Sequence, residues 1–114
     1  MVSNQLFAKR LKSARLRRAR QLGFESARGY SQERLGIEAG IDEESASARM
    51  NQYEQGRRLP DLGMASRLAE VLDVPMAYLF CPEDDLAELL LAVHEMDARK
   101  RRETLARLAG TRAS

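Results

Sequence analysis

The spacing of apolar residues along the chain predicts helices throughout and no strand. Apolar side chains recur three and four positions apart in several separate segments, which places them on one face of a helix. Only seven glycines and three prolines occur among the 114 residues, and such a composition favours helices. Spacing and composition together predict an all-α fold.

Residues that start and stop helices divide this pattern into segments. We expect Gly23, Gly40 and Gly56 to end the first three helices. Asp42 should cap the start of the third helix, and Asp61 the start of the fourth. The expected helices span residues 4–22, 32–39, 43–55, 62–73 and 75–80, and a further helical segment follows Pro82.

The same spacing predicts which residues face the core. In the fourth helix these are Leu62, Ala65, Leu68, Ala69 and Leu72. In the C-terminal segment an apolar stripe comprises Leu86, Leu89, Leu90, Val93 and Met96, and a piece capped by Asp97 adds Leu105 and Leu108. Such a leucine stripe either completes the core of a monomer or forms a dimer interface.

Several classes of protein are excluded by what the chain lacks. No segment is long and apolar enough to cross a membrane, and no apolar signal-peptide core is found near the N-terminus, so we expect a cytoplasmic protein. Cys81 is the only cysteine, which excludes a disulfide framework and a cysteine zinc site. The single histidine, His94, is expected to be packed or exposed. Without a nucleophile–base pair, a glycine-rich phosphate loop or a metal-ligand cluster, we expect neither an enzyme nor a cofactor.

Short motifs follow one another in a fixed order between residues 29 and 60, and one further piece, Arg15, lies in the first helix. A helix ends at a glycine, an apolar residue follows in the turn, and the next helix closes on apolar-Glu-x-Gly before a proline. The pieces are Arg15, Gly29-Tyr30-Ser31-Gln32, Ala39-Gly40-Ile41, Tyr53-Glu54-Gln55-Gly56 and Pro60. This order resembles the helix-turn-helix of the phage-repressor-like DNA-binding family (Cro and cI type, XRE family). The resemblance implies a five-helix lambda-repressor-like DNA-binding domain over residues 1–80. A C-terminal helical extension over residues 81–114 follows, and it can serve dimerisation.

The chain departs from compact family members at the entry to the third helix. Sixteen positions separate Gly40 from Gly56, more than in compact members. Either the third helix starts earlier or the turn before it is longer. Three acids at this entry, Asp42, Glu43 and Glu44, are expected to stabilise an N-terminal turn at the rim of the DNA groove. The alternative is a carboxylate that accepts a hydrogen bond from cytosine.

The third helix carries the candidate base-reading residues on the face opposite its apolar positions. Small and amide side chains suit the base edges of the major groove, where Asn and Gln pair with adenine and Arg with guanine. The resemblance places the base-reading positions on Ser47, Ala48 and Gln52, with Arg49 and Asn51 nearby.

Other residues are expected to hold the DNA backbone or the helices themselves. The resemblance implies that Gln32, at the start of the second helix, clamps a phosphate. Arg57 and Arg58 lie beside the N-terminus of the fourth helix, where an anion is favoured, so we expect phosphate contacts from them too. The family pairs Arg15 with Glu54 as a partly buried tie between helices.

Charge is unevenly distributed along the chain. The formal net charge is +2, with a balance of +3 in residues 1–80 and −1 in residues 81–114. Residues 1–20 hold seven basic side chains and no acid, and sixteen of the nineteen basic residues are arginine, whose planar fork suits phosphate and guanine. Such a run is ordinarily a solvated helix face, but beside a helix-turn-helix we expect it to face phosphate.

These features predict a sequence-specific DNA-binding transcriptional regulator, a bacterial or phage repressor that binds a palindromic operator in double-stranded DNA as a homodimer. The alternative is an antitoxin or other protein-interaction module whose DNA binding serves autoregulation and whose C-terminal helices bind a protein partner. Both use the same recognition helix, so they differ in what covers the C-terminal leucines.

Overall fold

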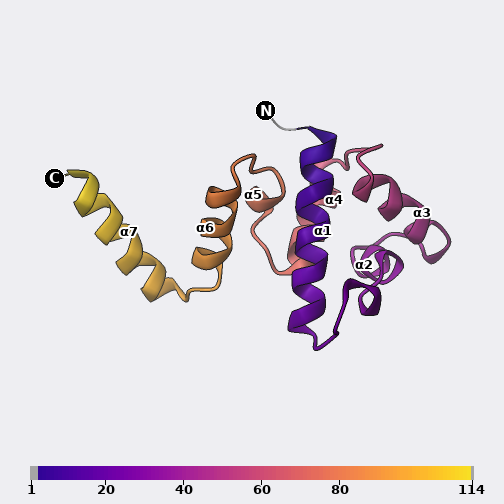
Figure 1. The fold of residues 1–114 in the computed structure, drawn as a ribbon, viewed down its shortest axis with the longest axis horizontal. Helices are drawn as coiled ribbons and strands as arrows, with labels where there is room; N and C mark the ends of the chain where they lie inside the picture. The colour runs from indigo at the N-terminus through magenta and orange to yellow at the C-terminus, as the bar shows by residue number, and fades with distance from the viewer. Residues whose placement is uncertain (1–2, 114) are drawn as a thin grey trace.

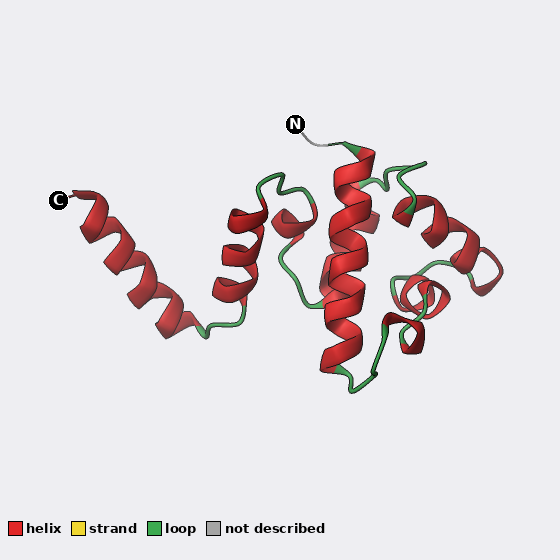
Figure 2. Cartoon of the chain, viewed as in Figure 1, coloured by secondary structure: helices red, strands yellow, loops and turns green. Residues whose placement is uncertain are grey.

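The chain folds into helices joined by short loops (Figure 1, Figure 2). The computed structural model describes residues 3–113, and the side chains of residues 3–110, and this part of the chain contains no strand. The helices are α1 (Asn4–Gln21), the 3-10 helix η1 (Ala27–Gly29), α2 (Gln32–Glu38), α3 (Glu43–Glu54), α4 (Leu62–Leu72), α5 (Met76–Leu79), α6 (Asp84–His94) and α7 (Ala98–Ala113). The all-α fold predicted from the sequence is confirmed.

Side chains cap the starts of several of these helices. The N-cap oxygens of Ser3, Ser31 and Asp61 accept hydrogen bonds from backbone N–H groups three residues further on, at 3.1, 3.0 and 2.8 Å. Such bonds satisfy N–H groups that the first turn of a helix leaves unpaired. Asp42 holds the same position before α3, but its carboxylate makes no capping hydrogen bond, contrary to the prediction.

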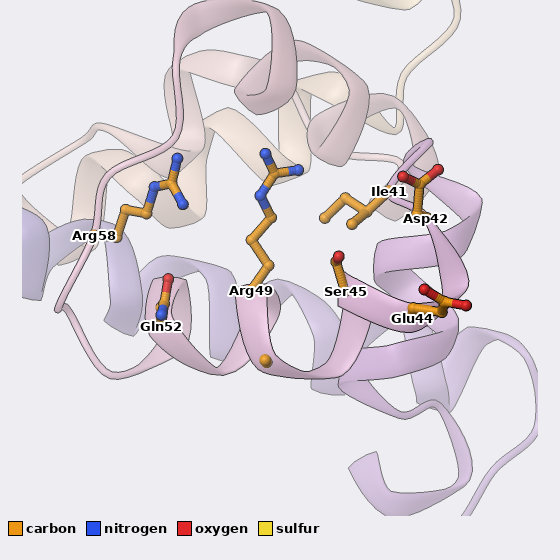
Figure 3. Close-up of a pocket in the computed structure, with 8 residues that line it drawn as sticks. Ile41, Asp42, Glu44, Ser45, Arg49, Gln52 and Arg58 are labelled. Atoms are coloured by element: carbon orange, nitrogen blue, oxygen red, sulfur yellow. The ribbon is translucent and has the colours of Figure 1, made fainter.

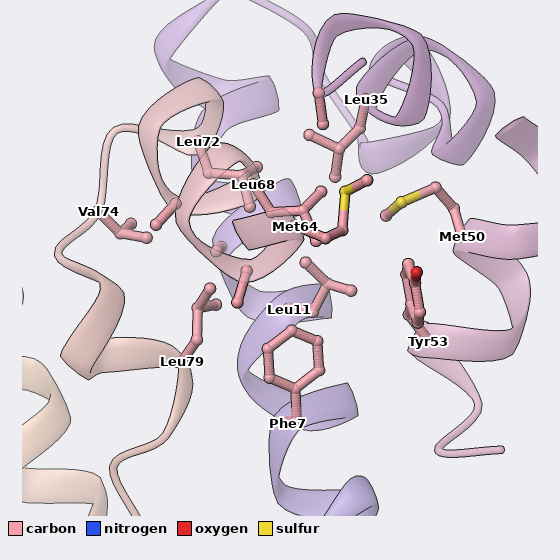
Figure 4. Packing of buried hydrophobic residues seen from close by; sticks show 14 of the residues in the cluster. Phe7, Leu11, Leu35, Met50, Tyr53, Met64, Leu68, Leu72, Val74 and Leu79 are labelled. Carbon is pink, nitrogen blue, oxygen red and sulfur yellow. The ribbon is translucent and has the colours of Figure 1, made fainter. Parts of the chain in front are cut away.

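The core surrounds α1, which packs against α3, α4 and α5. Figure 4 shows side chains from α1 to α5 and from the segment after α4 meeting in one cluster. Burial of each large apolar side chain stabilises the fold by about 1.5–3 kcal/mol. Among the fully buried side chains are Phe7, Leu11, Leu35, Met50, Leu68, Leu72 and Leu79.

Helices α2 and α3 approach each other closely at Gly36. A Cβ atom at this position would lie 2.8 Å from Met50 Cγ and 3.0 Å from Ala46 Cβ, so a larger residue requires movement. The turn between the two helices passes through Gly40, whose φ of +95° suits glycine, and then buries Ile41. These contacts hold α3 at a defined angle to α2.

One residue of α4 was predicted to face the core and does not. Leu62 is the first residue of the helix and is 70 % exposed, while Met64 is buried. Helical spacing alone placed Leu62 on the core-facing side of α4. The residue lies ahead of the part of α4 that packs on the body, so it remains in solvent.

The leucine stripe predicted for α6 does not complete the core of this chain. Ala87 is buried, and Leu90 and Leu91 pack against the core, but Leu86 and Leu89 are 44 % and 49 % exposed. The face that turns inward also carries polar groups that bind α1 from both ends of α6. Those polar contacts therefore select a face that apolar spacing did not indicate.

Beyond α6 the chain turns and α7 extends away from the body (Figure 1). The molecule consequently measures 55 × 33 × 23 Å along its principal axes. As predicted, Asp97 caps this last helix, its Oδ1 accepting from the Lys100 N–H at 2.8 Å. Over residues 98–110, the side chain of Thr104 is partly covered and all the others are exposed.

Candidate nucleic-acid interface

Helix α3 buries one face in the core and presents the other to solvent. Met50 is fully buried, whereas Ser47, Ala48 and Gln52 are exposed and Asn51 is partly exposed. A rotation of about 100° per residue places these four on the side away from the core. The face predicted to read bases is therefore open along the outside of α3.

The extra length before α3 belongs to the helix and not to the turn. α3 begins at Glu43, directly after buried Ile41 and the N-cap residue Asp42. Glu43 and Glu44 lie in its first turn, where the partial positive charge of the helix N-terminus favours carboxylates. Of the two alternatives left open by the sequence, the structure has the earlier start.

A buried ion pair ties α3 to α1. Arg15 Nε donates to Glu54 Oε2 at 2.7 Å, and Arg15 Nη2 donates to Glu54 Oε1 at 3.0 Å. The Arg15 Nη1 group donates to the carbonyls of Ala27 and Tyr30 at 3.0 and 2.8 Å. The carboxylate of Glu54 is only 1 % exposed, and a charge so buried requires such a partner. Glu54 therefore supports α3 from inside and has no surface to offer DNA.

This ion pair continues outward through two amide side chains. Gln32 Nε2 donates to Glu54 Oε1 at 3.3 Å, and Asn51 Nδ2 donates to Gln32 Oε1 at 3.4 Å. The chain of hydrogen bonds joins the start of α2 to the outer face of α3. It thus brings together the predicted phosphate contact Gln32 and the predicted base contact Asn51, and it orients both amides.

On the opposite flank of α3, arginines gather around two neighbouring hollows. Figure 3 shows Arg49 and Arg58 extending from different elements on the same side of the first hollow, with Gln52 beside them. Asp42 and Glu44 line its other end. Arg49, predicted among the base-reading residues, therefore lies with Arg58 on this flank. Arg57, which lies between the end of α3 and Arg58, is also exposed.

A third arginine, Arg67 of α4, was missed by the sequence analysis. It lines the second hollow together with Arg49 and Arg58. Its Nε donates to the Ala39 carbonyl at 3.0 Å, which holds the side chain against the turn before α3. Asp61 also lines this hollow, but one of its oxygens caps α4. Arg67 is the sole basic residue in α4, yet the sequence does not reveal that this flank of α4 borders α3.

The prediction that the basic run of α1 faces phosphate was wrong for Arg10 and Arg17, whose largely covered side chains bind groups at the two ends of α6. Arg10 is 5 % exposed and its Nε donates to the Cys81 carbonyl at 2.9 Å. Lys9 Nζ and Arg10 Nη2 both lie 3.0 Å from Asp84 Oδ1. Hydrogen bonds from these two cations hold the pKa of Asp84 below its usual value. Arg17 Nη2 donates to Glu95 Oε1 at 2.9 Å. These cations connect α1 to α6.

Tyr30 is a fully buried residue just before the start of α2. Burial, followed by its hydrogen bond to Glu38 Oε1 at 2.6 Å, raises the pKa of this tyrosine well above its usual range. Its ring also lies 5.2 Å from the guanidinium carbon of Arg34. This stacking occupies Arg34, which is not placed among the arginines of the two hollows.

The remaining sequence predictions concern metal ligands, membrane spans, His94 and Cys81. The described residues contain no group of three or more His, Cys, Asp or Glu side chains placed to hold a metal ion. None of their helices has the length and apolar character needed to cross a membrane. His94 Nε2 lies 3.0 Å from Asp73 Oδ1, and Cys81 is buried.

Helices α2 and α3 pack closely at Gly36 and are joined by a tight glycine turn, and α3 leaves its outer face open. This arrangement defines a helix-turn-helix DNA-binding domain. The family model described as "Helix-turn-helix" matches residues 16–79, and the chain belongs to this family, in the phage-repressor-like (XRE) group that the sequence motifs indicate. A solved structure, "Crystal structure of transcriptional regulator BswR", is 47 % identical, with a TM-score of 0.75. The match covers 91 % of this chain and 92 % of that one. No curated protein matches the chain.

Proposed function

We propose that the protein is a transcriptional repressor that reads a palindromic operator with α3 of each subunit in a dimer. The observation that carries this proposal is the outer face of α3, which is open to solvent and held from behind by a buried ion pair. The similarity to a transcriptional regulator supports it. Base reading falls to Ser47, Ala48, Arg49, Asn51 and Gln52.

The two flanks of α3 are suited to the two phosphate backbones that border a major groove. On one flank stands Gln32, oriented by Glu54 and Asn51. On the other stand Arg57 and Arg58. We add Arg67 to these phosphate contacts because it lines the same hollow as Arg58. Contacts of this kind fix register, while the base edges supply the sequence information.

The acids at the start of α3 limit how deeply the helix enters the groove. Glu43 and Glu44 are exposed in its first turn, and carboxylates repel phosphate. We therefore place this turn at the rim of the groove and the amide-bearing second half of α3 against the bases. In a dimer on a palindrome, the two α3 helices would lie about 34–36 Å apart, one turn of DNA.

Selection from random duplexes at two salt concentrations tests the proposal. We expect enrichment of a palindrome, and we expect Asn51→Ala and Gln52→Ala each to weaken discrimination at one position by about 1–3 kcal/mol. Arg67→Gln should instead weaken binding to all sequences about equally and make the salt dependence shallower by about one phosphate contact. Weak binding without any preferred sequence, abolished by moderate salt, would overturn the proposal.

A further inference from the structure

The two C-terminal helices expose leucines on faces that nothing in the described chain covers. Leu86 and Leu89 of α6 are 44 % and 49 % exposed. Leu105 and Leu108 of α7 are 67 % and 55 % exposed. Leu86 and Leu89 line a shallow hollow together with Asp85. Four half-exposed leucines within two adjacent helices constitute an interaction surface.

Helix α7 itself lacks the packing that normally maintains a helix of its length. An isolated helix of about 12–15 residues is marginal in water, and most helical stability in proteins comes from packing of an apolar face. Leu105 and Leu108, three positions apart, share a face of α7 that is turned to solvent. This helix therefore needs a surface against which to pack.

The charges beside the two leucine faces are of opposite sign. On α6, Asp85 lines the same hollow as Leu86 and Leu89, and the helix contains no lysine or arginine. Arg101 and Arg102, by contrast, precede Leu105 of α7 by four and three positions and so flank it on the same side. An acidic leucine face and a basic leucine face are complementary in both packing and charge.

The joint between the helices keeps α7 off the α6 of its own chain. Arg101 donates to the carbonyls of Val93 and His94, both at 3.4 Å, at the C-terminal end of α6. Asp97 caps α7 immediately after this joint. α7 consequently diverges from α6 (Figure 1), and the outer face of α6 stays open.

We infer that α7 of one copy packs across α6 of a second copy, with its Leu105 and Leu108 on the partner's Leu86 and Leu89. Basic Arg102 then lies beside acidic Asp85. The exchange is reciprocal. Both copies carry the same two faces, so a two-fold axis pairs α7 of each copy with α6 of the other. This inference rests on the proposed dimeric repressor and specifies the surface through which it dimerises.

Disulfide trapping between two different single-cysteine chains tests the exchange directly. Leu89→Cys and Leu105→Cys chains of distinguishable mass, mixed under mild oxidation, should form a mixed disulfide faster than either forms with itself. Leu62→Cys, at an exposed leucine of α4, is the matched control and should link to neither. Native Cys81 is common to all chains and is buried. A disulfide that forms only when both cysteines are in one chain would show an intramolecular hairpin and overturn the inference.

Sedimentation equilibrium of the full chain supplies the energetic test. Replacing both exposed leucines of α7 (Leu105→Asp with Leu108→Asp) should raise the dimer Kd by roughly a hundredfold or more. Asp85→Arg and Arg102→Glu should each raise it, and the two together should restore it. Leu62→Asp, the control, should leave it unchanged. A dimer indifferent to all α7 substitutions, or a chain that is monomeric at every concentration, would overturn the inference.

Failure of this inference is separable from failure of the proposed function. A monomeric chain that still selects a specific half-site would retain DNA reading by α3 and refute only the exchanged arms. An arm-exchanged dimer that selects no sequence would do the reverse. If the leucines instead require a foreign protein for cover, the chain alone remains monomeric, and the antitoxin-like alternative gains support.

Discussion

Helices α3 and α7 are both largely polar, yet they stand in opposite situations. α3 buries Met50 and Ala46 in the core, and its buried Glu54 is held by Arg15 of α1. α7 exposes Leu105 and Leu108, and its first turns hold the Asp97 cap and the exposed pair of Arg99 with Glu103. The difference shows that a polar helix packs on the body when its few apolar residues meet partners within the same chain. Where those partners are absent, the helix is free to meet another molecule.

The ion pairs of the two helices provide the strongest test of this contrast. Arg15→Ala would leave the carboxylate of Glu54 buried without its partner and should cost about 3–5 kcal/mol in the free energy of unfolding. Arg99→Ala removes a similar arginine–glutamate pair from α7, where Arg99 and Glu103 are exposed, and should cost less than about 1 kcal/mol. Urea unfolding followed by far-UV circular dichroism measures both. Equal costs would contradict the contrast.

Single leucines give a second, slightly smaller difference. Leu68 is fully buried, so Leu68→Ala should destabilise the fold by about 2–5 kcal/mol through lost burial and the cavity left behind. Leu105→Ala should change stability by no more than about 0.5 kcal/mol in dilute solution, where copies are separate. Thermal unfolding at low protein concentration makes the comparison. A large cost for Leu105→Ala under these conditions would mean that α7 packs on its own chain.

Two glycines extend the comparison to the backbone. Gly36→Ala brings a Cβ to 2.8 Å from Met50 Cγ, so we expect overpacking to cost about 1–3 kcal/mol and to weaken DNA binding by shifting α3. Gly110→Ala in α7 meets no heavy atom within 4 Å and should favour the helix by up to about 1 kcal/mol. Unfolding and DNA titration of both variants measure these effects. A neutral Gly36→Ala variant would show that α2 and α3 can separate without loss.

The parts of the fold that sequence reasoning predicted well are those whose signals are local. The glycine at position 40, with its positive φ, and the Asp61 cap act within a few residues, so their positions in the chain reveal them. The α6 face was not predictable in this way. Leucines and a valine surround much of α6, and the choice of inward face depends on hydrogen bonds between α1 and residues more than 70 positions away. Arg67 was missed for the same reason, because its neighbours in the hollow come from other elements.

The smallest expected effect concerns the contact between α6 and α1. Asp84 joins α6 to Lys9 and Arg10 of α1, and their hydrogen bonds lower its pKa from an ordinary 3.8. A carboxyl whose pKa is lower in the folded state stabilises fully above the ordinary value and loses that contribution as pH falls through the lowered one. Docking of α6 should therefore loosen at acid pH, as measured by amide hydrogen exchange in α6 with α3 as the internal control. Asp84→Asn should remove this pH dependence. If acid loosens α6 equally in that variant, another carboxyl holds α6 against α1, and Glu95, paired with Arg17, is the next to test.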